Sequence, residues 1–189
     1  MRLHAIVSDL DTARLAVDGG ATVLQLRLKG ASTDEVVAQG PPYLDLCRAA
    51  GIAFVVNDDL DAALRLEADG VHLGNEDEGA EDALAAGVLV GLSAATVEEA
   101  SEAQRAGAGY VGAGPVWETP TKRNVAPIGL AGLSAITEAI TIPVVAIGGV
   151  DAGNVAECIA AGADGVAVVR ASTEARALRE AVDAALAAR

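Results

Sequence analysis

The chain has 189 residues, which is enough for one domain with a full hydrophobic core and too few for two. Its hydrophobic residues make up 52% of the chain but its aromatic residues only 2%, a composition that favours α/β packing of small side chains. A formal net charge of −14 argues against sequence-independent nucleic-acid binding, because neutralising a phosphate backbone requires a basic surface.

The sequence contains no apolar run long enough to cross a bilayer, and its N-terminus lacks the apolar segment of a signal peptide. We therefore expect a cytoplasmic protein that has no membrane or nucleic-acid partner. The two cysteines, Cys47 and Cys158, lack the spacing of a metal site, so we expect reduced and partly buried thiols.

Short apolar runs alternate with helical segments along the whole chain, without a break in composition. They cover residues 3–8, 22–28, 53–57, 70–74, 89–93, 110–116, 143–148 and 165–169. Eight such units predict a single (β/α)8 TIM barrel over residues 1–189. An open, doubly wound sheet is the alternative, but no Gly-x-Gly-x-x-Gly motif follows the first run, which disfavours its dinucleotide-binding form.

Glycine and proline give two local predictions. The pair Pro41-Pro42 should split the second helical region or begin a helix at Pro42. Gly70, Gly109 and Gly165 each stand between a helix and a strand, where we expect turns with unusual backbone angles.

The second apolar run carries long polar side chains on alternate positions. Gln25, Arg27 and Lys29 are separated by leucines, so they share one face of the strand. In an antiparallel sheet this face would meet water. In a barrel it points inward, where an anion at the mouth would satisfy Arg27 and Lys29 together.

Acidic residues follow two neighbouring strands. Asn57, Asp58 and Asp59 end the third run, and Asp77 follows the fourth. Because the carboxyl ends of parallel strands lie at one edge, Asp58 and Asp77 could face each other and hold Mg²⁺. The alternative is that Asp58 or Asp59 caps the next helix while Asp77 lies in a solvated loop.

Three later segments suggest phosphate binding. The loop after the sixth run contains Thr119, Thr121 and Lys122, which suit a lid over phosphates, although a solvated loop would have the same composition. The pairs Gly148-Gly149 and Val169-Arg170 follow the last two strands, the usual phosphate-binding position in barrels. A simple tight turn is the alternative for the glycines.

Ser93 and His72 allow two interpretations each. Ser93 ends the fifth run and is either a hydroxyl of the site or, the interpretation that we favour from position alone, the cap of the next helix. His72 has apolar neighbours, which favours a hydrogen-bonded interior histidine over a metal ligand.

Taken together, these motifs resemble those of the thiamine phosphate synthase family, in the same order and over nearly the whole chain. The matching segments are Gln25–Lys29, Asn57-Asp58, His72–Asp77, Gly91–Ser93, Thr119–Lys122 and Ile147–Gly149. The resemblance implies a Mg²⁺-dependent transferase that joins hydroxymethylpyrimidine diphosphate to hydroxyethylthiazole phosphate and releases pyrophosphate.

The resemblance also implies roles for individual residues. Metal ligands would be Asp58 and Asp77. The diphosphate would contact Arg27, Lys29, Asn57 and Lys122, and the pyrimidine would lie near Gln25 and Ser93. The thiazole phosphate would contact Thr119, Thr121, Gly148, Gly149, Val169 and Arg170. Catalysis would rest on Ser93, Lys122, Arg27 and Lys29.

Four positions depart from the family pattern. Asn75 replaces a glutamine, Ala95 a histidine, Glu118 a proline and Arg170 a serine. Such changes leave open a non-catalytic binder of thiazole phosphate or thiamine phosphate. A relative that isomerises the thiazole phosphate is disfavoured, because Ala95 cannot transfer protons. The oligomeric state, including a homo-oligomer, stays open.

Overall fold

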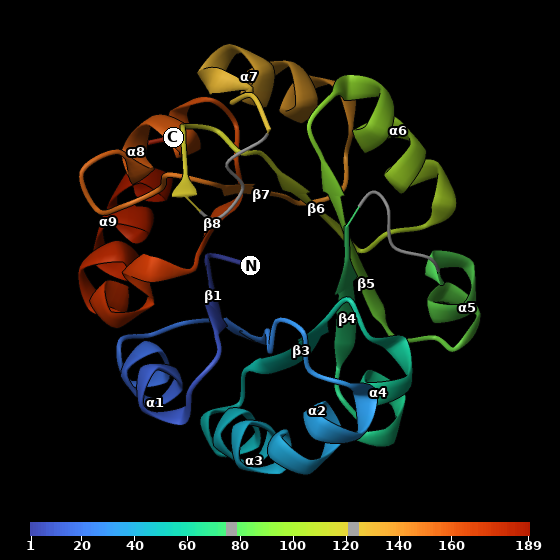
Figure 1. Cartoon of the computed structure of the whole chain (residues 1–189). Helices are drawn as coiled ribbons and strands as arrows, with labels where there is room; N and C mark the ends of the chain where they lie inside the picture. Colours follow the sequence, from blue (N-terminus) through green and yellow to red (C-terminus); the bar gives the residue numbers. More distant parts are fainter. Residues whose placement is uncertain (75–78, 121–124) are drawn as a thin grey trace.

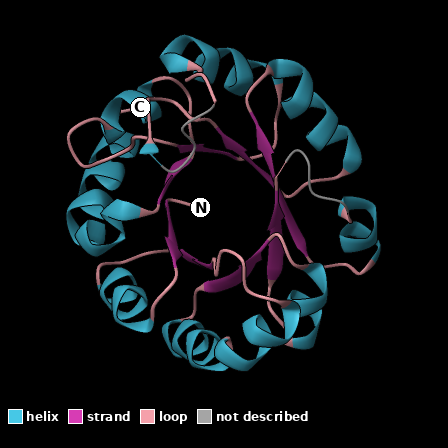
Figure 2. Cartoon of the chain, viewed as in Figure 1, coloured by secondary structure: helices cyan, strands magenta, loops and turns pink. Residues whose placement is uncertain are grey.

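The computed structural model describes residues 1–74, 79–120 and 125–189. Within these ranges, parallel strands pair in sequence order from β1 to β8, and β8 pairs with β1 to close a barrel. Helices surround the strands as an outer ring (Figures 1 and 2). The predicted (β/α)8 barrel is confirmed.

The strands are β1 (Leu3–Val7), β2 (Val23–Leu26), β3 (Ala53–Asn57), β4 (Gly70–Leu73), β5 (Leu89–Ala94), β6 (Tyr110–Ala113), β7 (Val144–Ile147) and β8 (Gly165–Val168). The helices are α1 (Leu10–Asp18), α2 (Thr33–Gln39), α3 (Pro41–Ala50), α4 (Leu60–Arg65), α5 (Ala80–Ala85), α6 (Val97–Ala106), α7 (Gly129–Ala139), α8 (Val155–Ala160) and α9 (Ala175–Ala187), and a 3₁₀ helix, η2 (Arg170–Glu174), precedes α9.

Alternate residues of each strand face opposite sides of the barrel wall. Outward-facing residues such as Leu24, Phe54 and Val111 are fully buried in the main core between strands and helices. A separate buried cluster lies inside the barrel and comprises Ile6, Tyr110, Val145 and Ala167. This alternation places every second side chain in the interior, beneath the carboxyl-terminal mouth of the barrel.

Short polar motifs fix where the helices begin. Ser32 and Glu35 form a reciprocal capping box at α2, and Thr96 caps α6 by accepting a bond from the Glu99 amide. The predicted break at Pro41-Pro42 is confirmed, since α2 ends at Gln39 and α3 begins at Pro41. Proline lacks the amide hydrogen that a helix interior requires but fits the first helical turn.

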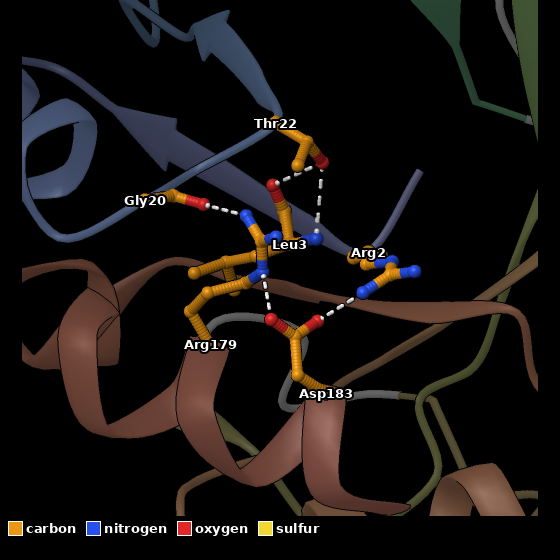
Figure 3. Close-up of polar contacts among 6 residues, drawn as sticks. All are labelled: Arg2, Leu3, Gly20, Thr22, Arg179 and Asp183. Carbon is orange, nitrogen blue, oxygen red and sulfur yellow. Dashed lines mark hydrogen bonds and ion pairs between the residues drawn. The ribbon is translucent and has the colours of Figure 1, made fainter. Parts of the chain in front are cut away.

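The last helix is tied to the first strand at the amino-terminal end of the barrel (Figure 3). Asp183 of α9 accepts from Arg2 at 2.6 Å and from Arg179 at 2.9 Å, and Arg179 also donates to the Gly20 carbonyl at 2.8 Å. The two arginines, Arg179 foremost, hold the pKa of the Asp183 carboxyl below its ordinary value. These contacts fasten the closing element of the chain to the opening strand.

Some predicted boundaries and turns are wrong. The second run was expected to be a strand through residue 28, but β2 ends at Leu26, so Arg27 and Lys29 lie beyond it. Gly70, Gly109 and Gly165 lack the positive φ expected of turn glycines. Gly70 and Gly165 instead begin strands, and a Cβ atom would collide with neighbours at all three, for example Leu89 beside Gly70 and Gly109.

Both cysteines are free thiols, as expected, but Cys47 and Cys158 are fully rather than partly buried. Burial raises the pKa of each thiol to about 12. Among the described residues, no helix combines the length and apolar character needed to cross a membrane.

Candidate functional site

A cavity of about 480 Å³ opens at the carboxyl ends of the strands, and we call it the mouth cavity. Its lining includes residues from strands or following loops around most of the barrel: Ile6, Gln25, Arg27, Asn57, Asp58, His72, Gly74, Ser93, Gly112, Gly114, Pro115, Thr119, Ile147, Gly148, Gly149, Val150, Asp151, Ala167, Val168, Val169, Arg170, Ala171 and Glu174. This is the end at which barrel proteins bind their ligands.

A second cavity of about 500 Å³ adjoins the first between the segments that follow β2 and β3, and we call it the side cavity. Lys29 and Thr33 line only the side cavity, whereas Arg27, Asn57 and Asp58 line both cavities. The structure therefore brings the predicted cations and Asp58 to the same end of the barrel. Lys29 is exposed rather than inside the barrel, because β2 ends three residues before it.

Asp58 and Asp59 differ in their backbone conformation and hydrogen bonds. Asp59 caps α4, since its carboxylate accepts from the Ala62 amide at 2.8 Å. Asp58 adopts a positive φ of 63°, and its own amide donates to the His72 carbonyl at 2.8 Å. The capping alternative thus holds for Asp59, which also lines the side cavity, whereas Asp58 lines both cavities.

Polar side chains form two short chains of contacts below the mouth cavity. Gln25 Nε2 lies 3.3 Å from His4 Nε2, and His72 lies between the Tyr110 hydroxyl (Nδ1, 3.0 Å) and the Ser93 hydroxyl (Nε2, 3.2 Å). His72 is therefore a hydrogen-bonded interior histidine, as predicted. Burial, reinforced by the charge of His72, lowers the pKa of His4 to about 3. Burial raises the pKa of Tyr110 above its ordinary value.

The favoured interpretation of Ser93 as a helix cap is wrong. Ser93 lies within β5, and Thr96 caps the following helix instead. The strand continues to Ala94, which places Ser93 on the inward face, beside His72 and on the wall of the mouth cavity.

The turns after β7 and β8 form the side of the mouth cavity opposite β3 and β4. Gly148 and Gly149 have φ of 95° and 72°, and Cβ atoms there would lie 2.5 Å from Pro115 Cβ and 2.7 Å from Trp117 Cβ. The glycines thus form a tight turn and also line the cavity, so a role in the turn and a role in phosphate binding are compatible. Val169 and Arg170 line the same region, and Arg170 is exposed.

The structure describes only some of the predicted residues of the loops after β4 and β6. Thr119 lines the mouth cavity, but Asn75, Asp77, Thr121 and Lys122 lie outside the described residues. Among the described residues, no group of three or more histidine, cysteine or acidic side chains could hold a metal ion by itself.

Sequence reasoning missed several residues at the site. Asp151 and Glu174 line the mouth cavity, and His4 and Tyr110 lie beneath it. The inward periodicity of β1 and β6 could have indicated His4 and Tyr110, because each shares its strand face with a cavity-lining residue, Ile6 and Gly112 respectively. Asp151 and Glu174 belong to connections whose course the strand pattern does not predict.

The closed barrel has a ligand-sized cavity at its carboxyl-terminal mouth, with Arg27, Arg170 and Asp58 in its wall, and these features define a (β/α)8-barrel protein with a candidate small-molecule site at the usual end of the barrel. A family model described as thiamine monophosphate synthase matches residues 4–172. The chain belongs to this family.

Individual relatives agree with the family model. A thiamine-phosphate synthase of Chloroflexus aurantiacus is 48% identical over 159 residues, covering 82% of this chain and 74% of the relative. Another from Pyrococcus abyssi is 44% identical over 177 residues, covering 93% and 86%. The solved thiamine phosphate pyrophosphorylase from Pyrococcus furiosus superimposes with a TM-score of 0.91 at 39% identity, covering 98% of this chain and 96% of that one.

Proposed function

We propose that this protein is a transferase that joins hydroxymethylpyrimidine diphosphate to hydroxyethylthiazole phosphate, forming thiamine phosphate and pyrophosphate. The observation that carries the proposal is the meeting of Arg27, Asn57 and Asp58 where the two cavities adjoin, in a chain that belongs to the thiamine monophosphate synthase family. The relatives named above carry the same activity in their names.

The diphosphate would lie against the cationic side of the site. Arg27 presents a planar guanidinium to both cavities, and Lys29 adds a second positive charge from the side cavity. Asn57 contributes an amide beside them. Their combined charge would stabilise the leaving pyrophosphate as negative charge accumulates on it. Lys122, outside the described residues, is proposed as a further cation on the same group.

The carboxylate of Asp58 suits Mg²⁺. Asp58 offers a carboxylate beside Arg27 and Asn57, a donor set that fits an ion held mainly by substrate phosphate and water. Asp58, together with Asp77 from outside the described residues, would hold the ion. When bound, Mg²⁺ would neutralise charge on the diphosphate.

The reaction needs positioning more than a protein nucleophile. The carbon–oxygen bond to the pyrimidine methylene breaks, its electron pair leaves with pyrophosphate, and the thiazole nitrogen supplies the pair for the new carbon–nitrogen bond. The pyrimidine ring stabilises the intervening positive charge. Gln25 and Ser93 would orient this ring in the inner part of the mouth cavity, in line with the thiazole.

The thiazole phosphate would bind across the cavity, at the turns after β7 and β8. Backbone groups of Gly148 and Gly149, the Thr119 hydroxyl and the Arg170 guanidinium border this region. Loops after the seventh and eighth strands commonly bind phosphate in barrels. Arg170 would add a positive charge where the family pattern has serine.

Crystals soaked with Mg²⁺ and pyrophosphate test the proposed arrangement. We expect pyrophosphate against Arg27 and Lys29, with the metal between it and Asp58. Pyrophosphate bound only at the turns after β7 and β8 would contradict this assignment. Ligand-dependent stabilisation without turnover would favour the alternative of a non-catalytic binder.

A further inference from the structure

His4 and Gln25 form a buried polar pair in the interior of the barrel. Both side chains are only 1% exposed, and their Nε2 atoms lie 3.3 Å apart. Gln25 lines the mouth cavity, whereas His4 does not. An effect of His4 on the cavity would therefore pass through a neighbouring side chain such as Gln25.

The pair leaves two polar atoms without a hydrogen-bond partner among the described residues. These atoms are His4 Nδ1 and Gln25 Oε1, and each is fully buried. Leaving a buried polar atom unpaired is costly, so such atoms at a binding site commonly await a ligand or an ordered water. Of these two atoms, only Gln25 Oε1 belongs to a residue that lines the mouth cavity.

The chemistry of the contact fixes the direction of its hydrogen bond. Gln25 Nε2 is an amide NH₂ and can only donate, so His4 Nε2 accepts and the ring proton lies on Nδ1. An accepting histidine must be neutral, and burial keeps it so by lowering the pKa of His4 to about 3. The same amide end of Gln25 also opposes the rise in the pKa of Tyr110 through a hydrogen bond. The donor end of Gln25 is thus turned toward the rings of His4 and Tyr110.

We propose that His4 is a positioning residue that fixes the orientation of the Gln25 amide, so that its buried oxygen rather than its NH₂ group is the one on the side of the mouth cavity, and that the cavity therefore selects a ring bearing an amino hydrogen-bond donor. An analogue with an oxo group in place of the amino group would place its oxygen, a hydrogen-bond acceptor, against Gln25 Oε1, which is also an acceptor. The identity of the ligand as an aminopyrimidine rests on the proposed function, but the positioning role does not.

The protonation state of His4 tests the positioning directly. The chain has two histidines, so a sample labelled with ¹⁵N at histidine gives two ring systems, which the His4→Phe variant assigns. We expect a neutral ring with its proton on Nδ1 from pH 5 to 8. A proton on Nε2 would overturn the proposal, because Gln25 would then present its NH₂ to the cavity.

Binding of the two ring types tests the selectivity. The probes are the aminopyrimidine alcohol and its oxo counterpart, which bind without reacting and are measured by calorimetry. We expect the wild type to prefer the amino form, and His4→Phe to reduce this preference about tenfold, the value of one hydrogen bond. An unchanged preference in folded His4→Phe would refute the selectivity.

A matched control removes a polar contact that the same two strands make away from the mouth cavity. The Thr22 hydroxyl bonds the Leu3 amide and carbonyl, both at 3.1 Å, at the amino-terminal end of the barrel (Figure 3). Thr22→Val should lower stability and leave the preference unchanged. If the wild type binds neither ring, the proposed substrate is wrong, while the His4 proton position still decides the positioning role.

Discussion

Asp58 and Asp59 are neighbours in the chain and both line the side cavity, but of the two only Asp59 caps a helix and only Asp58 also lines the mouth cavity. The Asp59 carboxylate is engaged by the Ala62 amide at the start of α4, while Asp58, with φ of 63°, lines both cavities. The Asp59 carboxylate therefore caps the helix, and Asp58 forms part of the walls of both cavities. The strained backbone at Asp58 is tolerable for aspartate, which visits the left-handed region more readily than most residues.

The two acids should respond differently to substitution. Asp58→Asn keeps the size and backbone tolerance of the side chain but removes its charge, so we expect coupling to fall by on the order of 100-fold with stability nearly unchanged. Asp59→Ala should lower the free energy of unfolding by about 1 kcal/mol and leave turnover nearly intact. Steady-state kinetics and urea denaturation measure both effects, and a reversed pattern would contradict the assignment.

Substitution of Lys29 should change the KM for one substrate and not for the other. Lys29→Ala removes a positive charge from the side cavity, so we expect KM for the pyrimidine diphosphate to rise by roughly 10- to 100-fold, as for loss of a charged hydrogen bond. KM for the thiazole phosphate should not change. Arg14→Ala is the control, because Arg14 pairs with Asp11 on the surface at α1. Equal changes in both KM values would argue against a diphosphate contact.

Substitution of Gly148 by alanine should lower the stability of the protein for two reasons, backbone strain and a steric clash. An alanine there would adopt an unfavourable φ of 95° and would place its Cβ 2.5 Å from Pro115 Cβ. Gly79 has φ of 98°, close to that of Gly148, but a methyl group added there would meet no atom within 4 Å, so Gly79→Ala reports the backbone effect alone, about 1 kcal/mol. Denaturation should show a clearly larger loss for Gly148→Ala, and equal losses would exclude the steric contribution.

Burial of His4 predicts a dependence of stability on pH. The pKa of His4 is about 3 in the folded protein against 6.5 for the exposed ring, so between these values the unfolded state binds the extra proton. The contribution is fully present above pH 6.5 and is lost as the pH falls toward 3, at up to about 1.4 kcal/mol per pH unit by linkage. His4→Phe should flatten the stability profile between pH 6.5 and 4. An unchanged slope would show that His4 titrates normally.

The fold could be predicted because the sequence patterns that indicate its strands and helices are local and are repeated along the chain. Eight apolar runs separated by helical segments admit few closed arrangements, and Pro41 sets a helix boundary that the structure reproduces. The carboxyl-end rule also predicted that Arg27, Asn57 and Asp58 would gather at one end.

The remaining features depend on contacts between distant segments. Whether Asp58 or Asp59 capped the helix was decided by the backbone conformation at Asp58, which the sequence does not encode in a visible pattern. Ser93 was misassigned because strand β5 continues to Ala94. A side chain at Gly91 would collide with the ring of Tyr110 on the neighbouring strand, and one at Gly112 would crowd the ring of His72 two strands away, a packing relationship that no local motif reveals.

Lys122 was predicted from the sequence alone, and its role stays a prediction. Lys122→Ala should reduce kcat while leaving the melting temperature unchanged, because the proposed contact forms with the diphosphate. Single-turnover kinetics and thermal denaturation provide the two readouts. Normal turnover would refute this role.

The central claim is tested most directly by product formation from the two substrates. Purified protein incubated with hydroxymethylpyrimidine diphosphate, hydroxyethylthiazole phosphate and Mg²⁺ should form thiamine phosphate and pyrophosphate in equal amounts, and omission of either substrate should abolish both products. Chromatography combined with a pyrophosphate assay gives the ratio. Binding of both substrates without either product would contradict the proposed function.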